Sequence, residues 1–69
     1  MKRGEAVGLL KELVAEELIH PSLVLIGERS LDNYQLQIKG NYDCKEIEQL
    51  VKDRFSLEEN NGYLILYKP

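Results

Sequence analysis

Cysteine and histidine, the side chains best suited to act as nucleophile and general base, each occur once in this 69-residue sequence, as Cys44 and His20. Cys44 lies where a helix is expected to begin, and a helix N-terminus can lower the pKa of a thiol and activate it. It also shares an apolar arc with Ile47 and Val51, and free cysteine is among the most buried residue types. We therefore expect Cys44 to be a packing residue. His20 precedes Pro21 at an expected helix end, where an imidazole caps the helix or lies on the surface.

The remaining sequence contains no recognisable catalytic or cofactor motif. With one cysteine and one histidine, the chain cannot form an intrachain disulfide or a metal site built from several Cys and His ligands. The five glycines are scattered and form no phosphate-binding loop. We therefore expect no catalytic residue, no metal and no cofactor. A small enzyme without a sequence signature is kept as an alternative, because shallow acid–base sites leave none.

Glu17 and Arg54 are charged residues near the centres of otherwise apolar helical arcs. A buried charge is costly unless it is paired or reaches water. Both residues are expected in the last turn of their helices, where they can escape to solvent at the edge of a sheet. The alternative is that each makes a polar contact to a ligand or partner. The two should not pair with each other, because antiparallel helices would place their last turns at opposite ends of the sheet.

The segment Tyr63–Tyr67 is apolar at every position, which is typical of a strand in the middle of a sheet. Side chains alternate along a strand, so if Leu64 and Leu66 face the core the other three face away. An aromatic and aliphatic sheet face is unusual in water and indicates an interaction surface. The expected interface consists of Tyr63, Ile65, Tyr67, Gln35, Gln37 and Lys39.

These features predict a small non-catalytic binding domain that docks a protein through its open sheet face, most simply a second copy in a homodimer. The alternative is a single-stranded nucleic-acid-binding module that uses Tyr63 and Tyr67 as a stacking platform. The net charge of −3 opposes contact with a phosphate backbone, so nucleic acid is the less favoured partner.

Composition supports one folded domain over residues 1–69, with 43% apolar and 30% charged residues. No stretch approaches the roughly 18 apolar residues of a membrane span, so no membrane partner is expected. The charged start of the chain is not followed by a purely apolar run with a cleavage site, so we see no secretory signal. Together with the lone cysteine, this predicts a cytoplasmic protein.

The elements that must position these residues follow from periodicity. Apolar residues at helical spacing predict a helix over 5–19, which Pro21 ends. A strand over 22–28 and a hairpin loop over 29–33 come next. Tyr34–Lys39 alternates apolar and polar residues and is the clearest strand.

The second half repeats this order. After a turn at 40–42, Asp43 is expected to cap a second helix, with Glu46 completing a capping box. A short strand over 55–58 and the final strand are joined by an Asn-Gly turn, a strong hairpin signal. A weak internal repeat supports the order: residues 13–18 and 50–55 share one apolar and charged pattern, and each expected helix precedes a hairpin.

The expected fold is therefore a two-layer αββαββ sandwich of the α+β class, with both helices on one face of a four-stranded mixed or antiparallel sheet. Moving the last strand to the front would give βαββαβ, the ferredoxin-like order, so the preferred topology is its circular permutation. In that topology the final strand and Tyr34–Lys39 are central. The strands over 22–28 and 55–58 lie at the edges.

Overall fold

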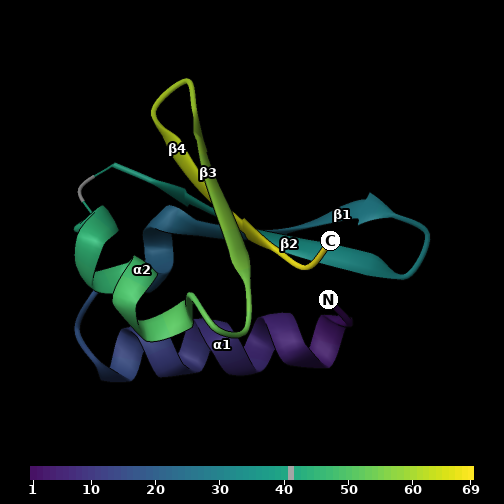
Figure 1. Cartoon of the computed structure of the whole chain (residues 1–69), viewed down its shortest axis with the longest axis horizontal. Coiled ribbons are helices and arrows are strands. Elements are labelled where there is room, and N and C mark those ends of the chain that lie inside the picture. The colour runs from purple at the N-terminus through teal and green to yellow at the C-terminus, as the bar shows by residue number, and fades with distance from the viewer. Residues whose placement is uncertain (41) are drawn as a thin grey trace.

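The computed structural model of the chain describes residues 1–40 and 42–69. These residues form two helices and a four-stranded antiparallel sheet, so the chain is an α+β protein. In Figure 1 helix α1 runs below the sheet, and the two chain ends lie near each other. The elements are α1 (Arg3–Ala15), the 3-10 turn η1 (Pro21–Leu23), β1 (Val24–Ser30), β2 (Asn33–Lys39), α2 (Cys44–Val51), β3 (Ser56–Asn60) and β4 (Tyr63–Tyr67).

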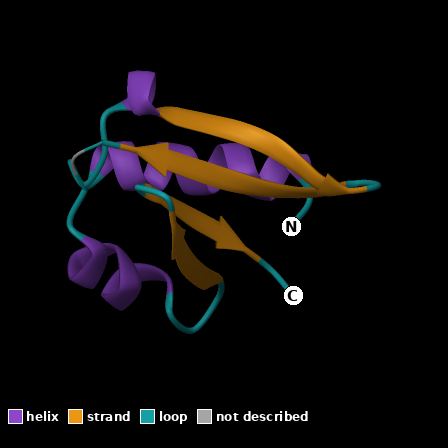
Figure 2. Ribbon diagram, turned by 90° about the horizontal axis from the view of Figure 1, so that it is seen from above, coloured by secondary structure: helices purple, strands orange, loops and turns teal. Residues whose placement is uncertain are grey.

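The strand order is β1-β2-β4-β3, and every neighbouring pair is antiparallel. The all-apolar β4 and the alternating β2 are therefore the central strands, as their sequences predict. The strands β1 and β3 lie at the two edges of the sheet. Figure 2 shows the two hairpins side by side, with α1 running along the β1–β2 hairpin.

One buried cluster joins the helices to the sheet. On β2 and β4, Leu36 lies opposite Leu66 and Ile38 lies opposite Leu64, so these four fully buried side chains share one face. Burying a side chain of this size contributes about 1.5–3 kcal/mol. The helical members of the cluster are Ala6, Leu9 and Leu13 from α1 and Ile47 and Val51 from α2.

Helix α1 ends at Ala15, so the expectation of a helix through residue 19 is wrong. Glu17 has φ 58°, the left-handed conformation. The Glu17 amide donates to the Val14 carbonyl and the Leu18 amide to the Leu13 carbonyl, each at 3.0 Å. This is the Schellman pattern that closes a helix. The chain reverses early because Ile19, only 8% exposed, then enters the core.

The first hairpin also differs from its predicted boundaries. Residues Pro21–Leu23 form a 3-10 turn, and β1 begins only at Val24, because the Ser22 and Leu23 amides donate to the Nδ1 and the carbonyl of His20. The strand then continues to Ser30, so the expected loop over 29–33 shrinks to two residues. Asp32 there has φ 58°, a conformation that aspartate tolerates.

The second half follows its predicted chemistry more closely. The Asp43 carboxylate accepts a 3.1 Å hydrogen bond from the Glu46 amide and caps α2. Strand β3 spans Ser56–Asn60, shifted from the predicted 55–58. Positive φ at Asn61 and Gly62 gives the type I′ turn that a two-residue hairpin favours. Part of the expected turn over 40–42 lies outside the described residues.

Candidate interaction surface

The six expected interface residues lie on one face of the sheet, opposite the buried cluster, and we call this set the outer face. Its members are Tyr63, Ile65, Tyr67, Gln35, Gln37 and Lys39. The β2–β4 register places Lys39 opposite Tyr63 and Gln37 opposite Ile65. The antiparallel pairing thus brings together residues that are far apart in the sequence.

Burial varies across the outer face. Ile65 is only 9% exposed, while Tyr63 and Tyr67 are half-buried. Leu25 of β1 lies opposite Gln37, and therefore on the outer face, with 64% of its surface exposed. The sequence indicates that one pair from residues 23–26 joins this face but leaves open which pair, because a continuous apolar run does not reveal which residues point inward. Leu25 enlarges the apolar part of the outer face toward the β1 edge.

Arg29 modifies the outer face in a way that the sequence did not indicate. Its guanidinium carbon lies 4.0 Å from the centroid of the Tyr67 ring, a cation–π geometry. The same guanidinium donates a 2.9 Å hydrogen bond to the Gln35 side-chain carbonyl. One face of the Tyr67 ring is therefore already occupied, and a nucleic-acid base could stack there only by displacing Arg29.

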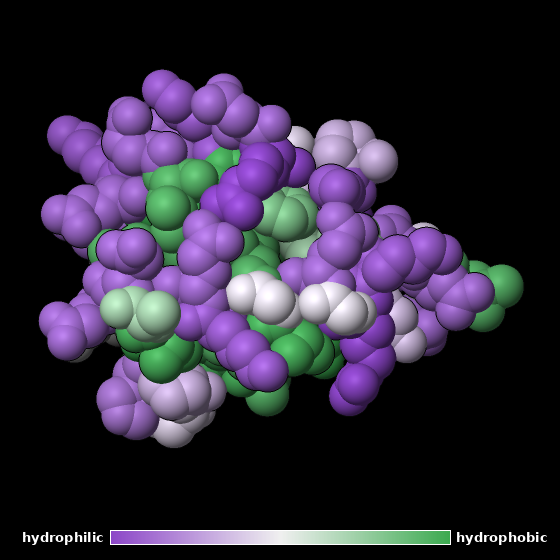
Figure 3. Space-filling view, turned by 90° about the horizontal axis from the view of Figure 1, so that it is seen from below, coloured by the Kyte–Doolittle hydropathy of each residue, from purple (hydrophilic) through white to green (hydrophobic). Residues whose placement is uncertain are grey.

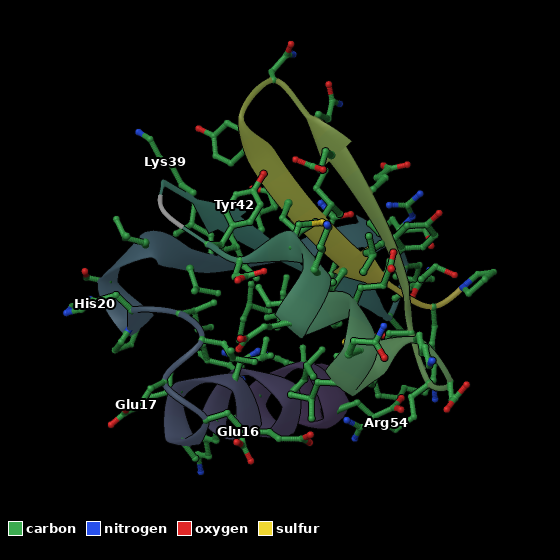
Figure 4. The ribbon with its side chains drawn as sticks, turned by 60° about the vertical axis from the view of Figure 1, so that its left-hand side comes forward. Glu16, Glu17, His20, Lys39, Tyr42 and Arg54 are labelled. Carbon is green, nitrogen blue, oxygen red and sulfur yellow. The ribbon has the colours of Figure 1, made fainter. Side chains whose placement is uncertain are left out.

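Glu17 and Arg54 lie apart from the outer face and from each other. Figure 4 shows them pointing outward from well-separated parts of the molecule. Arg54 instead forms a two-pronged ion pair with Glu12, at 3.1 and 2.7 Å. Its hydrogen bond lowers the pKa of Glu12, and Glu12 in turn raises the pKa of Arg54. Glu17 lies beyond the end of α1 and Arg54 beyond the end of α2, so the prediction that they occupy the last turns of these helices is wrong. Glu17 is exposed and is not on the apolar arc.

This ion pair borders a groove of about 660 Å³ between α1 and the segment that follows α2. Lys68 closes the other side by pairing with Glu5 at 2.7 Å. Both cations also lie near the Phe55 ring, Arg54 at 5.7 Å and Lys68 at 5.5 Å from its centroid. Figure 3 views the molecule from below, where hydrophobic patches appear between mainly hydrophilic side chains. The charged side chains of these two ion pairs already bind each other. The groove is therefore a weaker candidate for a binding site than the outer face.

His20 makes a local contact with a serine that sequence reasoning overlooked. Its Nδ1 lies 2.6 Å from the Ser22 hydroxyl and 3.3 Å from the Ser22 amide nitrogen, which donates to it. These bonds cap η1, and the group is exposed. The contact therefore stabilises a turn. Both hydrogen bonds described for the His20 ring go to Ser22, so they do not include the acidic partner of a catalytic triad.

Cys44 packs against the buried cluster, and its surroundings disfavour the thiolate. Desolvation raises the pKa of its thiol, and the negative charge of Glu59 raises it further. Tyr42 donates a 3.0 Å hydrogen bond to the Glu59 carboxylate. Its pKa is also raised, first by desolvation and then by Glu59. Both effects favour the protonated forms of the thiol and the phenol.

Within residues 1–40 and 42–69, no group of three or more histidine, cysteine, aspartate or glutamate side chains is arranged to hold a metal ion. Neither helix of the described chain has the length and apolar character needed to cross a membrane. No protein-family model, curated protein or solved structure matches the chain.

Proposed function

We propose that this chain is a small non-catalytic binding domain that docks a protein through the outer face, most simply a second copy in a homodimer. The observation that carries the proposal is the position of β4. As a central strand it puts Leu64 and Leu66 into the core and places Tyr63, Ile65 and Tyr67 on the opposite face. A symmetric pairing is the commonest way to cover such a surface.

The nucleic-acid alternative receives less support. A stacking platform needs aromatic faces that are open and basic residues around them. Arg29 covers one face of the Tyr67 ring, which leaves Tyr63 as the ring most suited to stacking. Glu58 lies opposite Ile65, so an acidic residue borders the surface on its β3 side. With a net charge of −3, a protein partner is the better match.

The proposed architecture is a two-layer sandwich with both helices on one face, in a circularly permuted ferredoxin-like topology. Its support is the strand order β1-β2-β4-β3 and the single buried cluster that contains residues of both helices. We also propose that the protein is cytoplasmic, on the basis of its lone cysteine.

The test is the double substitution Tyr63→Ser with Tyr67→Ser, followed by sedimentation across a concentration series. The proposal expects wild-type self-association that weakens about tenfold or more in the variant, because buried aromatic side chains dominate interface energies. Leu31→Ser is the matched control, since Leu31 is exposed at a hairpin tip away from the outer face. Circular dichroism would verify that each variant is folded.

Two results would overturn the homodimer. One is a wild-type monomer at high micromolar concentration, and the other is association that the tyrosine substitutions leave unchanged. A parallel titration with single-stranded oligonucleotides at low and high salt tests the alternative. Salt-dependent binding that is lost in the Tyr63→Ser variant would favour the stacking platform over protein docking.

A further inference from the structure

Strand β1 is an edge strand whose first four residues lack the usual protection of an edge. Among the described residues, the exposed large hydrophobic side chains are Leu23 at 37%, Leu25 at 64% and Leu31 at 87%, all in β1 or at its ends. Native sheets normally protect their edges with charges, shortness or bulges. The other edge, β3, carries Glu58 and Glu59. The first four residues of β1 carry no charge.

The backbone of β1 directs alternate peptide groups outward. The Tyr34 amide donates to the Met1 carbonyl at 2.6 Å, and the Met1 amino group donates to the Tyr34 carbonyl at 3.4 Å. Tyr34 is also the register partner of Glu28 in β1. Because its backbone groups are directed to Met1, they point away from β1. Glu28 and Tyr34 therefore form a non-hydrogen-bonded pair, and the Glu28 backbone groups point to the open edge.

The same alternation applies along the strand, since Ile26 pairs with Leu36 and Val24 with Ile38. Val24, Ile26 and Glu28 thus all point their backbone groups toward the edge. The Val24 amide already donates to the Pro21 carbonyl in η1. The remaining edge groups are the Val24 carbonyl and the amides and carbonyls of Ile26 and Glu28.

We infer that β1 pairs antiparallel with β1 of a second copy of this chain, with Ile26 on the two-fold axis. In this register the Ile26 amide donates to the carbonyl of the partner's Ile26, and the Glu28 amide donates to the carbonyl of the partner's Val24. Each copy thus supplies hydrogen-bond partners for the edge amides and carbonyls of the other, as in strand addition to a sheet edge. The two sheets then form one continuous sheet.

The side chains of β1 fit the same register. Leu25 comes to lie opposite the partner's Gly27, in the closer, non-hydrogen-bonded type of pair. Gly27 leaves room there, because a Cβ at this position would meet only Gln35 atoms, at 4.0 Å. The exposed Leu25 side chain can therefore cover the bare backbone of the opposite strand. On the inner side, Val24 and Ile26 are only half-buried at the edge of the sheet, and the partner strand would bury them further.

The paired segment is short, because it has structural limits at both ends. The η1 turn with Pro21 precedes it, and a register shift between Glu28 and Ser30 follows it. An interface of this length falls below the roughly 1,200 Å² of stable complexes, so the dimer should be weak and concentration-dependent. It lies in the plane of the sheet and leaves Tyr63 accessible. It is therefore independent of docking through the outer face.

Disulfide trapping tests the register. Leu25→Cys and Gly27→Cys are made separately in a Cys44→Ala background, mixed at high concentration and oxidised. Non-hydrogen-bonded partners have Cα atoms about 4.5 Å apart, within the range that a disulfide spans. The inference expects the mixed Leu25–Gly27 disulfide to exceed either symmetric product several-fold. Leu31→Cys, which lies outside the paired segment, is the control for random collision. Equal yields of all the products would overturn the inference.

A proline at Glu28 tests the outward amide. Glu28→Pro removes a donor at the open edge without removing a bond to β2, and edge strands tolerate such prolines. Glu28→Ala is the matched control, since it removes the side chain and keeps the amide. Sedimentation should show association about tenfold weaker for Glu28→Pro than for Glu28→Ala, because each copy loses a hydrogen bond. Equal association of the two folded variants would contradict the inference. If dimerisation survives the tyrosine substitutions but is lost in Glu28→Pro, the outer-face homodimer is rejected and the β1–β1 dimer is supported.

Discussion

The two halves of the chain, α1–β1–β2 and α2–β3–β4, have the same order of elements but differ at the starts and ends of their helices. Each half supplies one central strand, and the two strands contribute equally to the core through Leu36 and Ile38 on one side and Leu64 and Leu66 on the other. The difference lies in how their helices start and stop and in how their edges face solvent. The repeated pattern thus specifies the elements, while individual residues specify their limits.

The helix boundaries show this clearly. The Asp43 side chain caps α2 directly, whereas the start of α1 relies on the Glu5 carboxylate, which accepts from the Lys2 amide at 3.0 Å. At the other end, α1 closes with Glu17 in the left-handed conformation. Helix α2 ends at Val51, and the next residue, Lys52, has φ −55°, which is ordinary helical geometry.

The largest expected effect tests whether the halves share one core. Leu36→Ala and Leu66→Ala should each cost about 2–5 kcal/mol in the free energy of unfolding, because each leaves a cavity in a fully buried site. The two residues face each other, so the double variant should depart from additivity. Denaturant unfolding measures all three values. Leu57→Ala on the β3 edge is the control and should cost less, since Leu57 is only partly buried. Strict additivity would indicate two independent cores.

The next prediction concerns the helix starts. Asp43→Ala should lower the free energy of unfolding by about 1 kcal/mol, because the Glu46 amide loses its acceptor. Lys2→Ala should change it by a few tenths at most, because the bond to Glu5 uses the Lys2 backbone, which the substitution retains. Thermal and denaturant unfolding measure both. Equal losses would show that the two helices do not differ in this respect.

The helix ends should respond in opposite directions. Glu17→Gly is expected to stabilise the fold by about 0.5–1 kcal/mol, because glycine adopts the left-handed conformation without a Cβ penalty. Lys52→Gly is the matched control. It should destabilise by a similar amount, since its backbone is right-handed helical. A loss of stability in Glu17→Gly would contradict the assignment of the α1 terminus.

The smallest effect concerns the ion pair that connects the halves. Arg54 holds the pKa of Glu12 below its ordinary value, so the stabilisation is present above the unfolded-state pKa and is lost as pH falls through the folded-state pKa. The pair is solvent-exposed, so it should contribute less than about 1 kcal/mol and weaken with salt. In Arg54→Met the NMR-measured pKa of Glu12 should rise toward its ordinary value. An unchanged pKa would show that the pair does not persist in solution.

Local sequence signals predicted much of the fold. The all-apolar run of β4 and the alternation of β2 identified the central strands, and the apolar periodicity identified two helices. Asp43 marked a helix start, and Asn61-Gly62 marked a tight turn. The outer-face residues also followed, because alternation along one strand fixes which side chains lie together. These signals succeed because each depends on neighbours a few residues away.

Other features depended on contacts between distant parts of the chain. The sequence alone determined the two helices, the central strands and the shared face of Tyr63, Ile65 and Tyr67. The early end of α1, the Glu12–Arg54 pair and the position of Arg29 over Tyr67 were decided by the tertiary structure. The outward direction of the β1 amides also became evident only through the contact between Met1 and Tyr34. The physical reason is that periodicity specifies a face, whereas helix ends, ion pairs and edges depend on which remote groups the packed chain brings within reach.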